Sequence, residues 1–213
     1  KQKDISMNWT ILNVSIPVHD LDKSKQFYEM LLGSDHNSEI VYQPLFDNEE
    51  NIFFGRQGLG LRLFKPKPDL LVSNYIQSRR SYISILVENI DKIKVDLDKD
   101  NVNYIFKNAN KQNSLKSLLV QEPSLNLIQF IENSSGANEN INGWDMDLDW
   151  GVHHMNLESL DVRKSIDFFC NVVGMTEGKW VAPVNKGDFS IDPSELAILP
   201  LSNNNRGLHV IKP

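Results

Sequence analysis

Apolar residues alternate with polar residues or proline in the segment LNVSIPV, over residues 12–18. A period of two predicts a β-strand that has one apolar face. In the next segment, LDKSKQFYEMLL, apolar residues recur at helical spacing. Asp20 suits the N-cap of this helix, and Gly33 stands where a helix can end. We therefore predict a strand followed by a helix over residues 12–33.

Further strands are predicted after this helix. Turn-forming residues separate the segments IVYQPLF (40–46), NIFFG (51–55) and LGLRLF (59–64). The same order starts again at residue 82, where YISILVENIDKIKVDLDKDNV predicts a strand and a helix, and SLLVQEP and NLIQFIE predict later strands. Two units of the order β-α-β-β-β thus fill residues 9–132. The polar run over residues 133–150 is typical of a linker.

The chain also contains an internal repeat. Residues 13–33 and 154–174 align without a gap at an offset of 154 − 13 = 141. Near the last residue, GLHVIKP (207–213) matches GLRLFKP (60–66) at an offset of 207 − 60 = 147. A third unit therefore begins at Gly151, and a fourth would begin near residue 82 + 147 = 229. We expect one complete paired domain (9–132) and the first half of a second (151–213), whose remainder is absent from the chain.

Composition and charge exclude two classes of partner. The 213 residues carry a net charge of −6, so there is no basic face to neutralise the phosphates of a nucleic acid. No apolar stretch reaches the roughly 18 residues of a membrane span. The single cysteine, Cys170, cannot form an intrachain disulfide, which fits a reducing compartment. We therefore expect a cytoplasmic protein.

The motif D-L-x-x-S-x-x-F-Y-x-x-x-L-G, over residues 20–33, and the later segment EPSLNLIQF resemble the vicinal oxygen chelate superfamily. This group contains glyoxalases, bleomycin-resistance proteins and extradiol dioxygenases. The resemblance implies an α+β fold, in which two βαβββ units pair to curve a sheet around one cavity and the helices cover the outer face. In the metal enzymes of this family, the first strand carries a His or Gln ligand, the matching strand of the partner unit a His, and later strands a Glu.

The first domain offers a polar set that is poor in metal ligands. Strand alternation turns Asn13 and Tyr82 away from the helices, because successive side chains point to opposite faces. The resemblance places Arg62 and Gln129 at or beside ligand positions. Amides, a phenol and a guanidinium are unsuited to a divalent metal, so we expect no metal in this domain. Arg62 would favour an anion if a ligand binds, and a cavity lined without any ligand is the alternative.

The second domain reverses this expectation. His154 replaces Asn13, and His209 replaces Arg62, at positions that the repeat makes equivalent. Alternation places His154 and Asn156 on the cavity side, whereas His153 belongs to the opposite face, where it would pack or cap. Two inward imidazoles are a starting point for iron, manganese, zinc or nickel. We therefore predict a divalent metal in the C-terminal domain only, with Asn156 among the substrate-binding residues.

Two functions are compatible with these residues. The first is a metal-dependent enzyme that resembles extradiol dioxygenases or glyoxalases, an oxidoreductase or a lyase, and acts on a small substrate that chelates the metal through adjacent oxygens. The second is a non-catalytic small-molecule binding protein like the bleomycin-resistance proteins. Because open half-domains of this kind can pair with each other, we also expect a homodimer.

Overall fold

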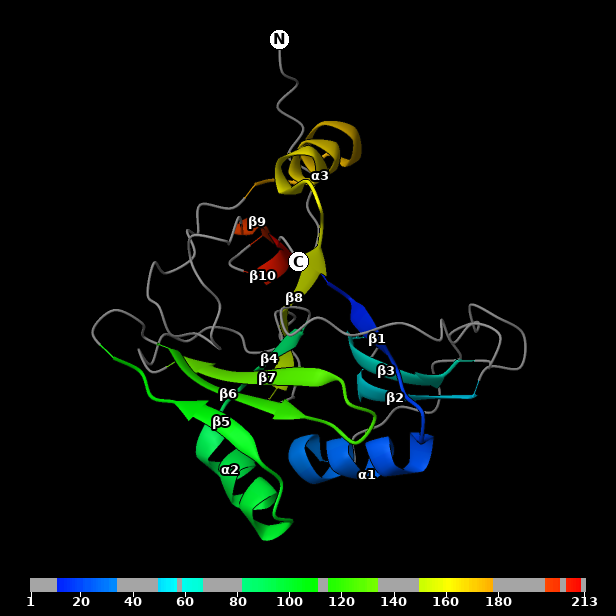
Figure 1. Ribbon diagram of the computed structural model, residues 1–213, viewed down its shortest axis with the longest axis vertical. Helices are drawn as coiled ribbons and strands as arrows, with labels where there is room; N and C mark the ends of the chain where they lie inside the picture. Colours follow the sequence, from blue (N-terminus) through cyan, green and yellow to red (C-terminus); the bar gives the residue numbers. More distant parts are fainter. Residues whose placement is uncertain are drawn as a thin grey trace. The chain divides into compact units, whose positions relative to one another are not determined.

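A computed structural model of the chain describes residues 11–33, 50–56, 59–66, 82–110, 115–133, 150–177, 198–203 and 206–211 (Figure 1). The chain divides into two compact units. The larger unit contains residues 12–77 and 84–152, and the smaller unit contains residues 1–11, 78–83 and 153–213. The predicted α+β fold with βαβββ-like units is confirmed.

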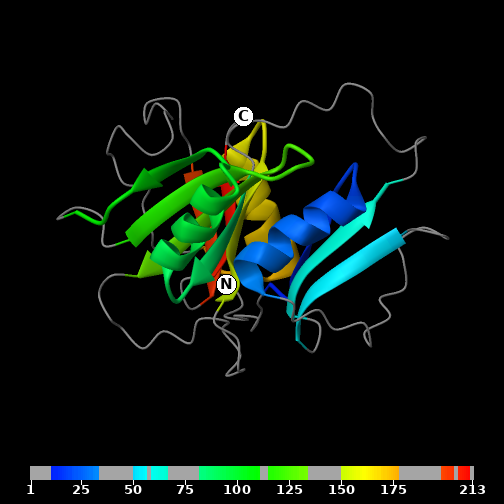
Figure 2. The same cartoon turned by 90° about the horizontal axis from the view of Figure 1, so that it is seen from below.

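The first βαβββ-like stretch forms a three-stranded sheet with one helix. Its elements are β1 (Asn13–Pro17), α1 (Leu21–Leu32), β2 (Glu50–Arg56) and β3 (Leu59–Lys65). The sheet has the order β1-β3-β2, in which β1 runs parallel and β2 antiparallel to β3. Figure 2 shows α1 lying across one face of these strands. The strand predicted over residues 40–46 lies outside the described residues.

The second stretch repeats this order in the larger unit. Its elements are β4 (Ile83–Val87), α2 (Ile90–Lys99), β5 (Tyr104–Lys107), β6 (Leu115–Gln121) and β7 (Leu127–Asn133). The strands follow the order β5-β6-β7-β4, and β6 is antiparallel to both β5 and β7. Most of the predicted linker, residues 134–149, is outside the described part of the chain.

The third stretch contains a helix that changes its winding. Its elements are β8 (Trp150–Glu158), α3 (Val162–Phe168), the π-helix η2 (Phe169–Val173), β9 (Ile198–Asn203) and β10 (Arg206–Ile211). The strand order is β8-β10-β9, with β10 parallel to β8 and antiparallel to β9. None of the helices in the described ranges is long and apolar enough to cross a membrane.

The two copies of the internal repeat fold with the same strand register. In the first copy Asn13 pairs with Gly60 in the parallel ladder of β1 and β3, and in the third stretch His154 pairs with Gly207 in the ladder of β8 and β10. Asp20 caps α1 by accepting a hydrogen bond of 3.1 Å from the backbone N–H three residues later. Asp161 makes the equivalent bond at 3.0 Å. The sequence match therefore reflects a structural repeat.

The face of β1 toward α1 is apolar, but it is shorter than the sequence predicts. Val14 and Ile16 are buried, as the alternating pattern requires. Leu12 was expected on the same packed face, and this expectation is wrong because 46% of Leu12 is exposed. The strand begins only at Asn13, so Leu12 precedes the segment that the helix covers.

A buried carboxylate joins the first and second stretches within the larger unit. Glu122 is 1% exposed and accepts a hydrogen bond of 2.8 Å from the Ser24 hydroxyl of α1. It also accepts bonds from the backbone and side-chain nitrogens of Asn126. Asn126 in turn donates to the backbone oxygen of Pro17 at 2.8 Å. Because the buried carboxylate has several donors, this network ties α1 and the end of β1 to the turn between β6 and β7.

Equivalent phenylalanines of the repeat differ in burial. Phe27 of α1 is 6% exposed, whereas Phe168 of α3, which aligns with it, is 51% exposed. Truncation to alanine is expected to cost about 3–5 kcal/mol of unfolding free energy at Phe27, and only about 1 kcal/mol at Phe168. Urea unfolding followed by circular dichroism measures both variants. Equal losses would contradict the difference in packing.

Candidate functional site

Polar side chains that are buried or partly buried gather on one face of β8 and β10. His154 and Asn156 are 9% and 7% exposed, and they share a face because they are two residues apart on one strand. His209 is the register partner of Asn156 and lies on the same face. The opposite face packs against α3 through the cluster of Val162, Ile166 and Val210. We call His154, Asn156 and His209 the β8/β10 polar face.

The histidines of this face are in direct contact. The rings of His154 and His209 stack with centroids 3.9 Å apart and an angle of 27° between their planes. The Nδ1 atom of His153 lies 2.8 Å from Nδ1 of His154, so one ring donates a hydrogen bond to the other. The sequence placed His153 on the opposite face, but its ring nevertheless reaches its neighbour. Alternation fixes the direction of Cβ and not where a long side chain ends.

Burial keeps both stacked imidazoles neutral. It lowers the pKa of His154 well below its usual range, and the nearby rings of His209 and His153 lower it further because they would repel a second positive charge. Burial also lowers the pKa of His209 from 6.5 to about 4. Near neutral pH these rings therefore offer lone pairs and N–H donors without a charge.

Tyr82 lies beside the β8/β10 polar face in the smaller unit. Its backbone oxygen accepts a hydrogen bond of 3.1 Å from the backbone N–H of Asn156. The sequence pattern groups Tyr82 with the residues of the first domain. The structure thus brings it next to one of the residues predicted for the second.

Two further polar groups occupy the larger unit, on strand faces opposite the helices. Arg62 is 4% exposed, and its Nε donates to the Ser15 hydroxyl at 3.0 Å. The guanidinium carbon of Arg62 also lies 5.2 Å from the centre of the Phe64 ring, a cation–π distance. Asn13 is two residues before Ser15 on β1 and so shares this face.

The second polar group of the larger unit consists of Gln129 on β7 and Ser84 on β4. Gln129 is 8% exposed and accepts a hydrogen bond at its side-chain oxygen from the hydroxyl of Ser84, which is completely buried. The bond offsets the cost of burying both polar groups. This hydrogen bond therefore links β7 to β4.

The comparisons with known proteins agree with this architecture. A family model described as bleomycin resistance protein-like N-terminal matches residues 10–37. A solved structure of a "putative dioxygenase" from Bacillus subtilis subsp. subtilis str. 168 has a TM-score of 0.57 and 14% identity, covering 95% of this chain and 63% of that one. Glyoxalase I from Zea mays has a TM-score of 0.55 and 14% identity, covering 95% of this chain and 66% of that one.

This chain has the fold of the vicinal oxygen chelate superfamily. The aligned part of this chain spans slightly less than two thirds of the length of each of these two neighbours. Identities of 14% establish the fold, and the chemistry must be argued from the residues themselves. No curated protein matches this amino-acid sequence.

The vicinal oxygen chelate fold raises the question of whether the polar residues suit a metal ion. The donor type of the β8/β10 polar face fits, because neutral imidazoles are ligands for iron, zinc, nickel and manganese. The arrangement of the two rings does not suit a metal ion. Lone pairs lie in the planes of the rings, so two stacked imidazoles do not aim at one point between them. The described residues contain no group of three His, Cys, Asp or Glu side chains that could hold an ion.

Proposed function

We propose that the β8/β10 polar face, together with Tyr82, binds a small molecule that carries oxygen atoms. The observation that supports this proposal is the gathering of a buried imidazole, His154, a buried amide, Asn156, and a partly buried imidazole, His209, on one face of two neighbouring strands. A few convergent polar groups in apolar surroundings are typical of small-molecule sites, since burying such groups without use costs free energy. The imidazole and amide N–H groups would donate hydrogen bonds to the oxygens of the ligand.

A second candidate is a metal-dependent enzyme similar to extradiol dioxygenases or glyoxalases. The repeat favours it, because His154 and His209 occupy the positions of Asn13 and Arg62 in the first copy and share one face. On this hypothesis iron, manganese, zinc or nickel would bind in the C-terminal domain only, through His154 and His209 and further donors. Asn13, Arg62 and Gln129 would form a metal-free site in the N-terminal domain, where the guanidinium suits an anionic ligand.

Metal analysis of the purified protein separates the two candidates. If the enzyme hypothesis is right, about one metal ion per chain should survive dialysis, and His154→Ala should lose it. His19→Ala is the matched control, because His19 is an exposed histidine before α1. Loss of metal in both variants, or in neither, would contradict a site at His154.

The binding proposal is tested with catechol, which carries two adjacent hydroxyl oxygens. Imidazole signals of His154 and His209 in NMR spectra should shift in a saturable way on addition of catechol to metal-free protein, and His154→Ala should weaken this binding about tenfold. Shifts that never saturate would overturn the proposal. In protein that holds metal, oxygen consumption with catechol indicates a dioxygenase, and turnover of a thiol adduct indicates a lyase.

We also propose that the protein forms a homodimer and is cytoplasmic. A homodimer would cover apolar side chains that are exposed in the smaller unit, such as Leu160 and Val172, which are 90% and 73% exposed. A cytoplasmic location is proposed because the 213 residues contain a single cysteine, Cys170, which fits a reducing compartment. Light scattering of the purified chain measures the mass of the assembly.

A further inference from the structure

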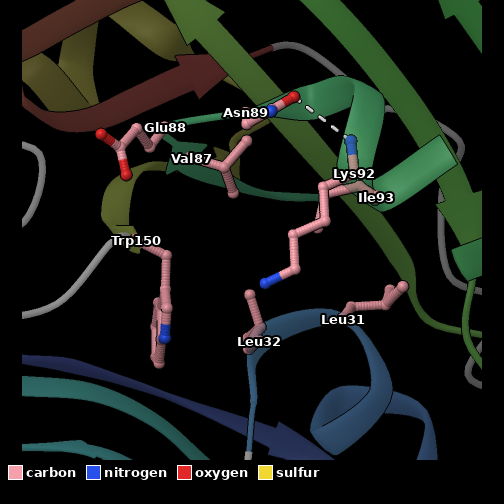
Figure 3. A pocket seen from close by; sticks show the side chains of 8 residues that line it. All are labelled: Leu31, Leu32, Val87, Glu88, Asn89, Lys92, Ile93 and Trp150. Atoms are coloured by element: carbon pink, nitrogen blue, oxygen red, sulfur yellow. Dashed lines mark hydrogen bonds between the residues drawn. The ribbon is translucent and has the colours of Figure 1, made fainter. Parts of the chain in front are cut away.

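A pocket lies in the larger unit, and none of its lining residues belongs to the polar sets described above. It occupies about 210 Å³ between the end of α1 and the start of α2 (Figure 3). Its walls are apolar and buried, and its rim is polar and exposed. The walls consist of Leu31, Leu32, Val87, Ile93 and Trp150, and the rim consists of Glu88, Asn89 and Lys92.

The indole of Trp150 provides a buried donor in this pocket. Trp150 is 2% exposed, and its Nε1–H has no hydrogen-bond acceptor among the residues that the structure describes. In Figure 3 the indole nitrogen lies on the edge of the ring that faces Lys92 and Leu32. A buried donor without an acceptor destabilises the folded chain, and a phenylalanine at this position would avoid that cost. The indole is therefore suited to an acceptor atom inside the pocket.

The rim adds a positive charge to the same space. Figure 3 shows the Lys92 side chain extending between Trp150 and Leu32, whereas the carboxylate of Glu88 points away from the Lys92 ammonium. The start of α2 does not itself attract an anion here. The Asn89 side chain accepts from the backbone N–H of Lys92 at 3.2 Å, and Glu132 accepts from that of Ile90 at 2.7 Å. The cation of the pocket is thus the Lys92 ammonium.

We propose that this pocket binds a small monocarboxylic acid. Its carboxylate would accept a hydrogen bond from the Trp150 indole and pair with the Lys92 ammonium at the rim. Its apolar body would fill the space between Leu31, Leu32 and Ile93. A volume of about 210 Å³ corresponds to about seven water molecules, which admits a short aliphatic chain and excludes a large ligand. The pocket shares no residue with the β8/β10 polar face and does not depend on the function proposed for it.

Hexanoate is a suitable probe for this proposal, with hexanol and hexylamine as neutral and cationic controls of similar shape. In ¹⁵N-labelled full-length protein, the indole signal that disappears in Trp150→Phe is the signal of Trp150. We expect hexanoate to shift this signal in a saturable way, hexanol to bind more weakly, and hexylamine to leave it unchanged. Absence of a saturable shift with hexanoate, or equal shifts with hexylamine, would overturn the proposal.

Lysine variants make the test independent of the tryptophan. Lys92→Met should weaken hexanoate binding about tenfold, because a charge-assisted contact is lost while the apolar walls remain. Lys99→Met is the matched control at the other end of α2, where Lys99 pairs with Asp96, and it should leave the affinity unchanged. Both lysines are exposed, so both variants should fold. Equal affinity in the two variants would contradict a carboxylate site at Lys92.

Discussion

Gly60→Ala is expected to prevent stable folding of the larger unit. A Cβ atom at this position would lie 2.0 Å from the backbone oxygen of Phe54, and Gly60 has a φ of +146°, which L-residues rarely adopt. The oxygen belongs to β2, which is bonded to β3 along its length, so it cannot move without breaking the ladder. We expect a loss of at least about 4 kcal/mol, comparable with the whole stability of a domain. Urea unfolding and the yield of soluble protein measure this loss.

Gly33→Ala is the control that separates crowding from backbone strain. Gly33 also has a positive φ, +83°, but a Cβ there would meet nothing within 4 Å. Its ψ is 174°, so the backbone conformation is one that is almost confined to glycine, and only this strain remains, which costs about 1–3 kcal/mol. Equal stability of the two alanine variants would contradict the close contact between Gly60 and the backbone oxygen of Phe54.

The order of elements could be predicted because local patterns determine it. The period of two gave β1, and Asp20 and Gly33 gave the two ends of α1, since capping depends on residues near in the sequence. The π-helix after Phe168 could not be predicted. The aligned segments of the repeat have the same length, and the apolar spacing of residues 169–173 is compatible with an ordinary helix. Helix winding depends on hydrogen bonds that side-chain pattern does not encode.

The candidate site could be predicted as a face but not as a set of contacts. Alternation along β8 puts His154 and Asn156 on one side, and the repeat predicts that His209 is their neighbour across the ladder. The stacking of His154 on His209 depends on side-chain rotamers, and the bond between Asn156 and Tyr82 on pairing between distant segments. The pocket at Trp150 was missed, since this residue stands at the edge of a polar run that reads as a linker.

Acidification from about pH 7 to about pH 4.5 is expected to destabilise the chain through the two stacked histidines. Above about pH 6.5 an imidazole is neutral in both the folded and the unfolded chain, so it adds no pH dependence. Below that value the unfolded chain takes up a proton at His209, whereas the folded chain does so only near pH 4. The free energy of unfolding must therefore fall as the pH falls through this window.

The size of this effect follows from the pKa of His209. Each pH unit between the unfolded and folded pKa values costs about 1.4 kcal/mol, so His209 alone accounts for about 2.5 kcal/mol at pH 4.5. His154 acts in the same direction, because burial and its neighbours also lower its pKa. Urea unfolding at several pH values, with a chelator present to exclude metal, gives the slope directly.

The sister copy of the repeat suggests the control for this measurement. His154→Asn introduces the residue found at the equivalent position, Asn13, and His209→Gln adds a neutral side chain of similar length. The double variant keeps His153 and every carboxylate, so the titration of these groups is common to both proteins. The difference in unfolding free energy between the two proteins should change by at least about 3 kcal/mol between pH 6.5 and pH 4.5. Parallel curves would mean that His154 and His209 are accessible to protons in the folded chain, which their burial against each other does not allow.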